Sequence, residues 1–180
     1  MQTQQLSFHG AMPPLAVLRV DAKWGLVGSW LQLRWRVEGA RKVLVPPFTG
    51  RRRSDGLWQD TCFEMFVQPS GGAAYAEFNF SPSEAWAAYD FTAWREGMAD
   101  RALSHDPVIT PRGSGDLLIV DVALPLADLP ALPAALSLTC VIAEEGGAKS
   151  YWAMAHGQPD RPDFHDPACF GALLEPPSQS

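Results

Sequence analysis

The sequence predicts an all-β fold: a jelly-roll-like β-sandwich of roughly nine or ten antiparallel strands with little helix. Three observations support this prediction. Apolar residues recur at every second position along most of the chain, which is typical of half-buried strands. Clusters of Gly, Pro, Ser and Asp interrupt these runs at short intervals, as turns do. Only residues 125–133 have the pattern of a helical turn, and their prolines keep it short.

The alternation is clearest in residues 30–37 (WLQLRWRV), where Leu31, Leu33 and Trp35 fall on one side and Arg34 on the other. Similar runs recur along the chain and end at turn-forming residues. In chain order, the predicted strands are residues 15–20, 30–37, 42–48, 61–67, 75–81, 85–94, 107–110, 117–124, 136–144 and 150–155.

The length and composition predict one globular domain spanning residues 1–180, with a loose tail at 176–180. The chain is 47% hydrophobic and 19% charged, which is enough apolar material for a proper core. The three cysteines are odd in number and widely separated, so neither a disulfide framework nor a metal knuckle is expected. Cys62 and Cys140 fall in apolar strands and are expected to be buried thiols.

The charge and hydropathy patterns argue against two classes of partner. A net charge of −6 does not suit a nucleic-acid-binding protein, which usually carries a basic excess. No apolar run approaches the ~20 residues that span a bilayer, so no membrane partner is expected. The N-terminal segment lacks the features of a signal peptide, and a cytoplasmic location is therefore predicted.

Residues 61–81 are predicted to form a hairpin around the loop QPSGGAA. One register of this hairpin places Glu64 opposite Glu77 and Cys62 opposite Asn79. Alternation assigns Phe63, Met65, Val67, Ala76, Phe78 and Phe80 to the core face, and Cys62, Glu64, Phe66, Tyr75, Glu77 and Asn79 to the other face. Opposed like charges destabilise a sheet unless an arginine, a shared proton, a metal or a ligand compensates. This face is therefore a candidate functional site.

Carboxylates and amides hydrogen-bond to vicinal hydroxyls, and indole rings stack on the apolar faces of sugars. Polar groups that converge beside aromatic walls are typical of a small-ligand pocket. The competing interpretation is a solvated strand face with ordinary core tryptophans. The candidate ligand-binding residues are Trp58, Glu64, Glu77 and Asn79, with Arg95 and Trp152 as additions.

Three alternatives remain open on the sequence. Glu64 and Glu77 could act as the carboxyl pair of a glycoside hydrolase, at a separation of ~5–10 Å. Residues 156–171 carry His and Asp side chains that could hold a metal, although Asx turns are the favoured interpretation. Haem b and a structural calcium are the cofactors considered, while the favoured interpretation has none. The candidate axial ligands are Met65, Met98, Met154, His105, His156 and His165.

Three blocks resemble the DOMON-like proteins related to family 9 carbohydrate-binding modules: LWQDTCFEMFVQP, YAEFNFSPSEAWAAYDFTAWREG and RPDFHDPACFG. The resemblance extends from about Leu31 to Gly171. It implies a β-sandwich that holds a small carbohydrate ligand, often a glucose or cellobiose end, between two tryptophans.

Carried over by motif, the resemblance implies that Trp58 is one stacking platform and Trp152 the second. It implies polar contacts from Glu64 and Asn79. Glu77 departs from the pattern, because the sugar-binding modules tend to place an arginine two residues before that asparagine. The predicted function is non-catalytic binding of a small carbohydrate or sugar-derived ligand, with a haem-binding redox module and a glycoside hydrolase as alternatives.

Overall fold

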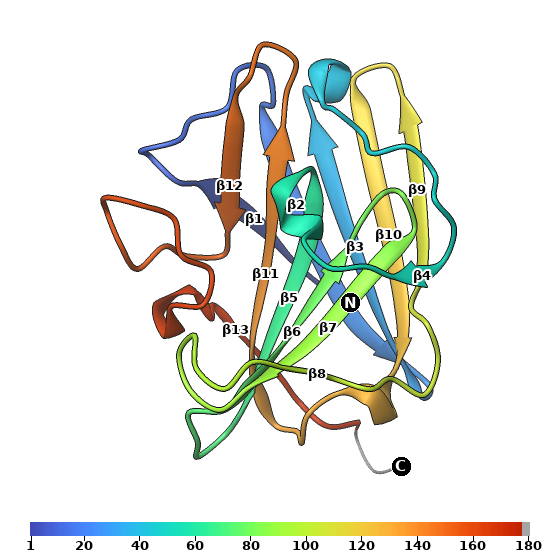
Figure 1. Ribbon diagram of the computed structural model, residues 1–180, viewed down its shortest axis with the longest axis vertical. Helices are drawn as coiled ribbons and strands as arrows, with labels where there is room; N and C mark the ends of the chain where they lie inside the picture. The colour runs from blue at the N-terminus through green and yellow to red at the C-terminus, as the bar shows by residue number, and fades with distance from the viewer. Residues whose placement is uncertain (178–180) are drawn as a thin grey trace.

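The computed structural model describes residues 1–177, whose strands form two layers (Figure 1). The first sheet contains β1 (Gln2–Phe8), β2 (Arg19–Val27), β3 (Trp30–Glu38), β10 (Leu117–Pro125) and β9 (Val108–Ser114), in that spatial order. The second contains β4 (Arg52–Arg53), β7 (Ala85–Phe91), β6 (Tyr75–Phe80), β5 (Cys62–Pro69), β11 (Ala134–Ala143) and β12 (Lys149–Ala153). β8 (Ala99–Asp100) pairs with β7, and β13 (Ala172–Leu174) pairs with β11. This arrangement confirms the predicted all-β, sandwich-like fold.

Among residues 1–177, helix is confined to four single 3₁₀ turns: η1 (Ala40–Lys42), η2 (Leu57–Gln59), η3 (Leu126–Asp128) and η4 (Pro167–Cys169). The turn η3 lies inside the segment 125–133 for which the sequence predicted a short helical turn. Within residues 1–177, no helix has the length and apolar character needed to cross a membrane.

The main core lies between the two sheets and follows the alternation along each strand. In β3, Leu31, Leu33, Trp35 and Val37 are buried, whereas the alternate positions from Trp30 to Glu38 are exposed or half-buried. Trp35 is fully buried there, with its ring centroid 5.5 Å from that of Phe63 and 6.2 Å from that of Phe80. These contacts join β3 to β5 and β6, so the aromatic residues predicted to face inward hold the two layers together.

The outer face of the second sheet is also covered. Every residue of β6 is buried, whereas a strand with one solvated face would alternate. A smaller apolar cluster on this face contains Phe66, Tyr75, Tyr89, Phe91 and Phe164. Phe164 belongs to the segment 156–171, and His165 of the same segment contacts Tyr75 and Glu77 of β6. The face predicted to be either a site or a wet surface is thus a partly enclosed space.

The structure differs from the predicted strand pattern in several places. Its described part has 13 strands instead of nine or ten, and the short β4–β7 pair is parallel rather than antiparallel. The polar strand β1 was not predicted, and the predicted strand 15–20 begins only at Arg19. Residues 42–48 contribute only an isolated bridge at Val43, because Pro46 and Pro47 lack the backbone N–H that a strand needs. Of the predicted tail, 178–180 lie outside the described residues.

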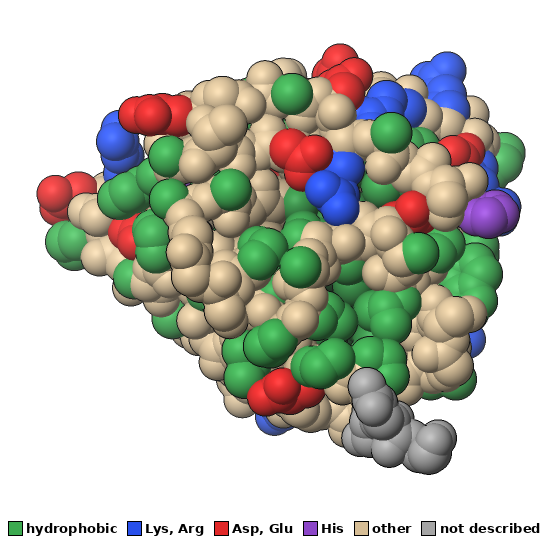
Figure 2. Space-filling model, turned by 90° about the horizontal axis from the view of Figure 1, so that it is seen from below, with side chains coloured by type: hydrophobic (Ala, Val, Ile, Leu, Met, Phe, Trp, Pro, Cys, Tyr) green, Lys and Arg blue, Asp and Glu red, His purple; other side chains and the backbone are tan. Residues whose placement is uncertain are grey.

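Two further surface and core features agree with the composition. All three cysteines are buried free thiols, as predicted for Cys62 and Cys140. The face shown in Figure 2 exposes apolar side chains between charges of both signs, which are intermingled and not gathered into one patch.

Candidate ligand-binding site

A cavity of about 690 Å³ opens on the outer face of the second sheet. Five aromatic residues line it: Trp58, Tyr89, Phe91, Tyr151 and Phe164. Its ionisable lining residues are Asp55, Glu64, Glu77, Tyr89, Arg95, Asp100, Tyr151 and His165. The volume falls within the range of ~300–1,000 Å³ that small-molecule sites occupy in proteins.

The two glutamates face this cavity, but the register that placed Glu64 opposite Glu77 is wrong. Glu64 pairs with Asn79 and Phe66 pairs with Glu77, a shift of two residues along β6. A shift of two preserves which face each side chain occupies, so the predicted faces are unchanged. Glu64 and Glu77 are therefore diagonal neighbours, whose α-carbons are typically ~7–8 Å apart.

Glu64 is buried with almost no hydrogen bonding. Its side chain is on a residue only 3% exposed, and its one hydrogen bond comes from the Thr139 hydroxyl at 3.5 Å. Burial, and then the nearby charge of Glu77, raise the pKa of Glu64 well above its ordinary value. The protonated form of this carboxyl is therefore favoured relative to an ordinary glutamate, and that form can both donate and accept a hydrogen bond.

Glu77 is the second buried carboxyl, on a residue 6% exposed. The amide nitrogen of Asn79 donates to its Oε1 at 3.0 Å. Burial raises the pKa of Glu77 to about 7, although this hydrogen bond and the charge of Arg95 oppose the shift. Asn79 itself is fully buried beneath the cavity, and its Oδ1 accepts no hydrogen bond from the described residues.

His165 connects Glu77 to the neighbouring turn. Its Nδ1 lies 2.6 Å from the hydroxyl of Tyr75, and its Nε2 lies 3.5 Å from Oε2 of Glu77. The Tyr75 oxygen also accepts the backbone N–H of Arg95 at 3.1 Å, so Tyr75 links His165 to the turn that contains Arg95. Burial, and then the charge of Arg95, lower the pKa of His165 to about 4. The contact with Glu77 is therefore a polar contact of a neutral ring and not an ion pair.

Arg95 is held in an unusual backbone conformation beside the cavity. Its φ of 58° lies in the left-handed region that favours glycine. Its Nη2 and Nε donate to Asp163 Oδ1 at 2.8 and 3.2 Å, and Trp94 Nε1 donates to Oδ2 at 3.2 Å. Because burial of Asp163 is outweighed by these Arg95 contacts, the pKa of Asp163 is lowered. The guanidinium charge is thus already matched by a carboxylate.

The segment 156–171 is ordered by its own aspartates. Asp163 anchors it to Arg95, and Asp166 caps η4 by accepting the backbone N–H of Ala168 at 2.9 Å. Gly157 passes so close to the Asp166 carboxylate that a Cβ would lie 2.2 Å from it. Within residues 1–177, no group of three or more His, Cys, Asp or Glu side chains is arranged to hold a metal ion.

Trp58 lies at the mouth of the cavity, half exposed at 51%. It is in η2, which begins after Gly56 with a φ of 72°. The Lys149 ammonium donates to the carbonyl of Gln59 and ties this turn to β12. An exposed indole in a fixed turn can stack on a ligand that enters the cavity.

The structure brings together four of the six predicted residues and separates two from the cavity lining. Trp58, Glu64, Glu77 and Arg95 line it, while Asn79 lies behind Glu77. Trp152 is 2% exposed and packs in the main core, with its ring 5.5 Å from that of Phe8. The adjacent residue, Tyr151, lines the cavity. Because neighbouring strand residues point to opposite faces, Trp152 cannot also line it.

Sequence reasoning missed Tyr89, Tyr151 and Phe164 as lining residues. The strand pattern could have identified Tyr89, because this residue of β7 pairs directly with Glu77 of β6. Among the candidate haem ligands, only Met98 and His165 line the cavity. Both ring nitrogens of His165 already have polar contacts within the protein.

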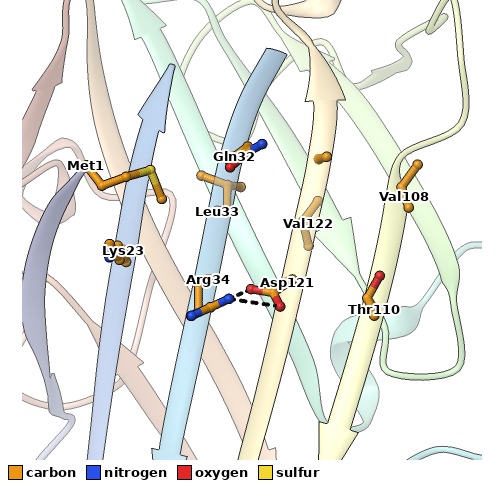
Figure 3. Close-up of a pocket in the computed structure, with 10 residues that line it drawn as sticks. Met1, Lys23, Gln32, Leu33, Arg34, Val108, Thr110, Asp121 and Val122 are labelled. Carbon is orange, nitrogen blue, oxygen red and sulfur yellow. Dashed lines mark hydrogen bonds and ion pairs between the residues drawn. The ribbon is translucent and has the colours of Figure 1, made fainter. Parts of the chain in front are cut away.

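A second, shallower hollow of about 340 Å³ lies on the outer face of the first sheet (Figure 3). Its central charges are paired, because Arg34 and Arg112 both contact Asp121. Its described lining residues include no aromatic side chain. The cavity of the second sheet is therefore the better candidate for a ligand.

A scan against protein-family models and a search of curated proteins found no match for this sequence. Two solved structures share its fold. A proposed carbohydrate-binding protein from Bacteroides uniformis ATCC 8492 is 17% identical, with a TM-score of 0.61 over 94% of this chain and 84% of that chain. A family 9 carbohydrate-binding module from Caldicellulosiruptor kristjanssonii, solved with cellotriose, is 11% identical, with a TM-score of 0.55 over 96% of this chain and 83% of that chain. At these identities the similarity shows the fold alone.

Proposed function

We propose that this protein binds a small carbohydrate or sugar-derived ligand in the cavity of the second sheet, without chemical conversion. The observation that carries the proposal is the convergence of buried carboxyl groups and aromatic walls in one concave space. The two structures of similar fold support it, because one is a proposed carbohydrate-binding protein and the other a module solved with cellotriose.

The binding mode follows from the lining residues. Trp58 stacks on an apolar face of the sugar, while Glu64 and Glu77 hydrogen-bond to its hydroxyl groups. Asn79 positions the Glu77 carboxyl through its hydrogen bond of 3.0 Å. No cofactor takes part in this mode, and affinity is modest because sugars exchange water for protein hydrogen bonds with little net gain.

Calorimetric titration with a panel of mono- and disaccharides tests the proposal. Wild-type protein is expected to bind at least one sugar saturably, and Trp58→Ala to weaken that binding about tenfold, by loss of one stacking contact. Trp30→Ala is the matched control, because Trp30 is also partly exposed but lies at the start of β3 in the other sheet. Equal affinity of Trp58→Ala and wild type, or no binding at all, would overturn the proposal.

Glycoside hydrolysis is the second candidate, favoured by one observation. Glu77 has a pKa of about 7, which suits a general acid at neutral pH, and Glu64 is its diagonal neighbour. Chromogenic glycosides test this directly. Turnover that Glu64→Gln and Glu77→Gln both abolish would replace binding by catalysis.

A further inference from the structure

We propose that the cavity selects a sugar that carries a positively charged ammonium group, in other words an amino sugar. The inference rests on the proposed function and names its ligand class. It is carried by two buried carboxyl groups that face the cavity without a cationic partner, beside aromatic walls.

The charges that line the cavity are unbalanced. Four lining residues carry carboxyl groups, Asp55, Glu64, Glu77 and Asp100, against one guanidinium, that of Arg95. The Arg95 charge is already matched by Asp163 at 2.8 Å, outside the lining. A ligand therefore meets acidic groups and only one cation, which is engaged elsewhere.

Two of the four acidic groups have local partners. Asp100 lies 3.4 Å from Nη1 of Arg53, and Asp55 accepts the hydroxyl proton of Tyr89 at 2.6 Å. The other two, Glu64 and Glu77, form no ion pair with any lysine or arginine among residues 1–177.

Glu64 is the side chain that points most directly to a ligand. Its exposed fraction is only 3%, and it lines the cavity. Its only hydrogen bond among the described residues is a long one from Thr139, at 3.5 Å. Buried carboxyl groups in proteins are normally paired with a cation or well hydrogen-bonded. An ammonium group in the cavity favours the ionised form of Glu64, so its binding displaces the carboxyl proton. It also supplies N–H donors to a side chain whose only hydrogen bond among the described residues is the one from Thr139.

The aromatic walls suit a cation as well as a sugar ring. Trp58, Tyr89 and Tyr151 line the same space as the two carboxyls. Electron-rich ring faces attract ammonium groups, most strongly for Trp. A sugar acid or sugar phosphate, in contrast, would bring a negative charge towards four carboxyl groups.

A series of glucose derivatives that differ in charge tests this inference by calorimetry on the wild-type protein at pH 6.5. The series is glucosamine (cationic), glucose and N-acetylglucosamine (neutral) and glucuronate (anionic). Glucosamine is expected to bind about tenfold more tightly than glucose, because one charge-assisted hydrogen bond contributes a factor of about this size. Glucuronate is expected to bind more weakly than either. Glu64→Gln and Glu77→Gln are expected to abolish the tenfold preference for glucosamine over glucose, so the ratio of the two affinities is the readout and not the affinity for glucose itself.

Asp106→Asn is the matched control, because Asp106 is an exposed acid outside the cavity lining, and it is expected to keep the advantage. The possible outcomes separate the two proposals. If glucose or N-acetylglucosamine binds as tightly as glucosamine, the inference is wrong and sugar binding stands. If glucuronate binds best, the inference is likewise wrong. If none of the four sugars binds, and no member of the broader panel of mono- and disaccharides binds either, both proposals are wrong.

Discussion

At the scale of single residues, the carboxyls of Glu64 and Glu77 are neighbours on one sheet face, where two negative charges would need compensation. Arg95 does not form an ion pair with either of them, because Asp163 holds its guanidinium. Burial instead raises the pKa of both carboxyls, and the charge of Glu77 raises that of Glu64 further, so each takes up a proton more readily than an ordinary glutamate. Alternation alone placed both on one face, but register depends on how many residues the turn at 70–74 takes up, and no local pattern reveals that.

Glu77→Gln is expected to change the pH dependence of stability. The free energy of unfolding of the variant, relative to that of wild type, is expected to be higher at pH 8 than at pH 5. The folded-state pKa of Glu77 is raised from 4.5 to about 7, so folding favours its protonated form. Wild type therefore loses stability as the pH rises through this window, by up to about 3 kcal/mol, and the uncharged amide does not. Urea unfolding of both proteins at the two pH values measures the difference.

The comparison between variant and wild type is needed because His165 acts in the opposite direction. Its folded-state pKa is lowered from 6.5 to about 4, so its contribution to stability is lost as the pH falls through that window. His165 titrates in both proteins, and its pKa of about 4 lies below the range of pH 5 to pH 8, so its contribution to the difference in this range is small. A difference that stays constant from pH 5 to pH 8 would contradict the protonated state assigned to Glu77.

At the scale of elements, the cavity depends on the segment 156–171 and the turn that contains Arg95. The sequence predicted an ordered coil with Asx turns for this segment, and Asp166 does cap η4. The contact between Asp163 and Arg95 joins positions 68 residues apart, so no local pattern shows it. The orientation of β12 was also hidden from the sequence. Tyr151 and Trp152 are adjacent, and only the packing of the strand decides that Tyr151 faces the cavity and Trp152 the main core.

Asp163→Asn is expected to loosen this segment and to destabilise the fold by about 1–3 kcal/mol. The change removes the charge-assisted hydrogen bonds from Arg95 and weakens the one from Trp94. Thermal unfolding and limited proteolysis of the segment 156–171 are the measurements. Asp160→Asn is the control, because Asp160 is exposed in the same segment. Equal proteolysis of the two variants would show that the Asp163 contacts do not hold the segment.

At the scale of the whole molecule, β1 joins the two sheets. Its residues Gln2–Leu6 pair with β2 in the first sheet, whereas Ser7 and Phe8 pair with β12 in the second (Figure 1). Without β1, both β2 and β12 would present unpaired edges. The sequence did not predict this strand because only Leu6 in it is buried, so it lacks the apolar alternation that revealed the inner strands.

Leu6→Ala is therefore expected to destabilise the protein by about 2–5 kcal/mol, since Leu6 is 1% exposed in the main core. Denaturant unfolding measures the loss. Leu18→Ala is the matched control, because Leu18 is 74% exposed, and its effect is expected to be within about 0.5 kcal/mol. Equal losses in the two variants would mean that β1 contributes no more than a surface loop.

The most direct test of the central claim follows the indole N–H resonances of the seven tryptophans by NMR during titration with the tightest-binding sugar. Only Trp58 lines the cavity, so its resonance is expected to shift saturably while that of Trp30, in the other sheet, stays in place. Saturable shifts of Trp30 without Trp58 would place the ligand elsewhere. A spectrum unchanged by every sugar would contradict carbohydrate binding in this cavity.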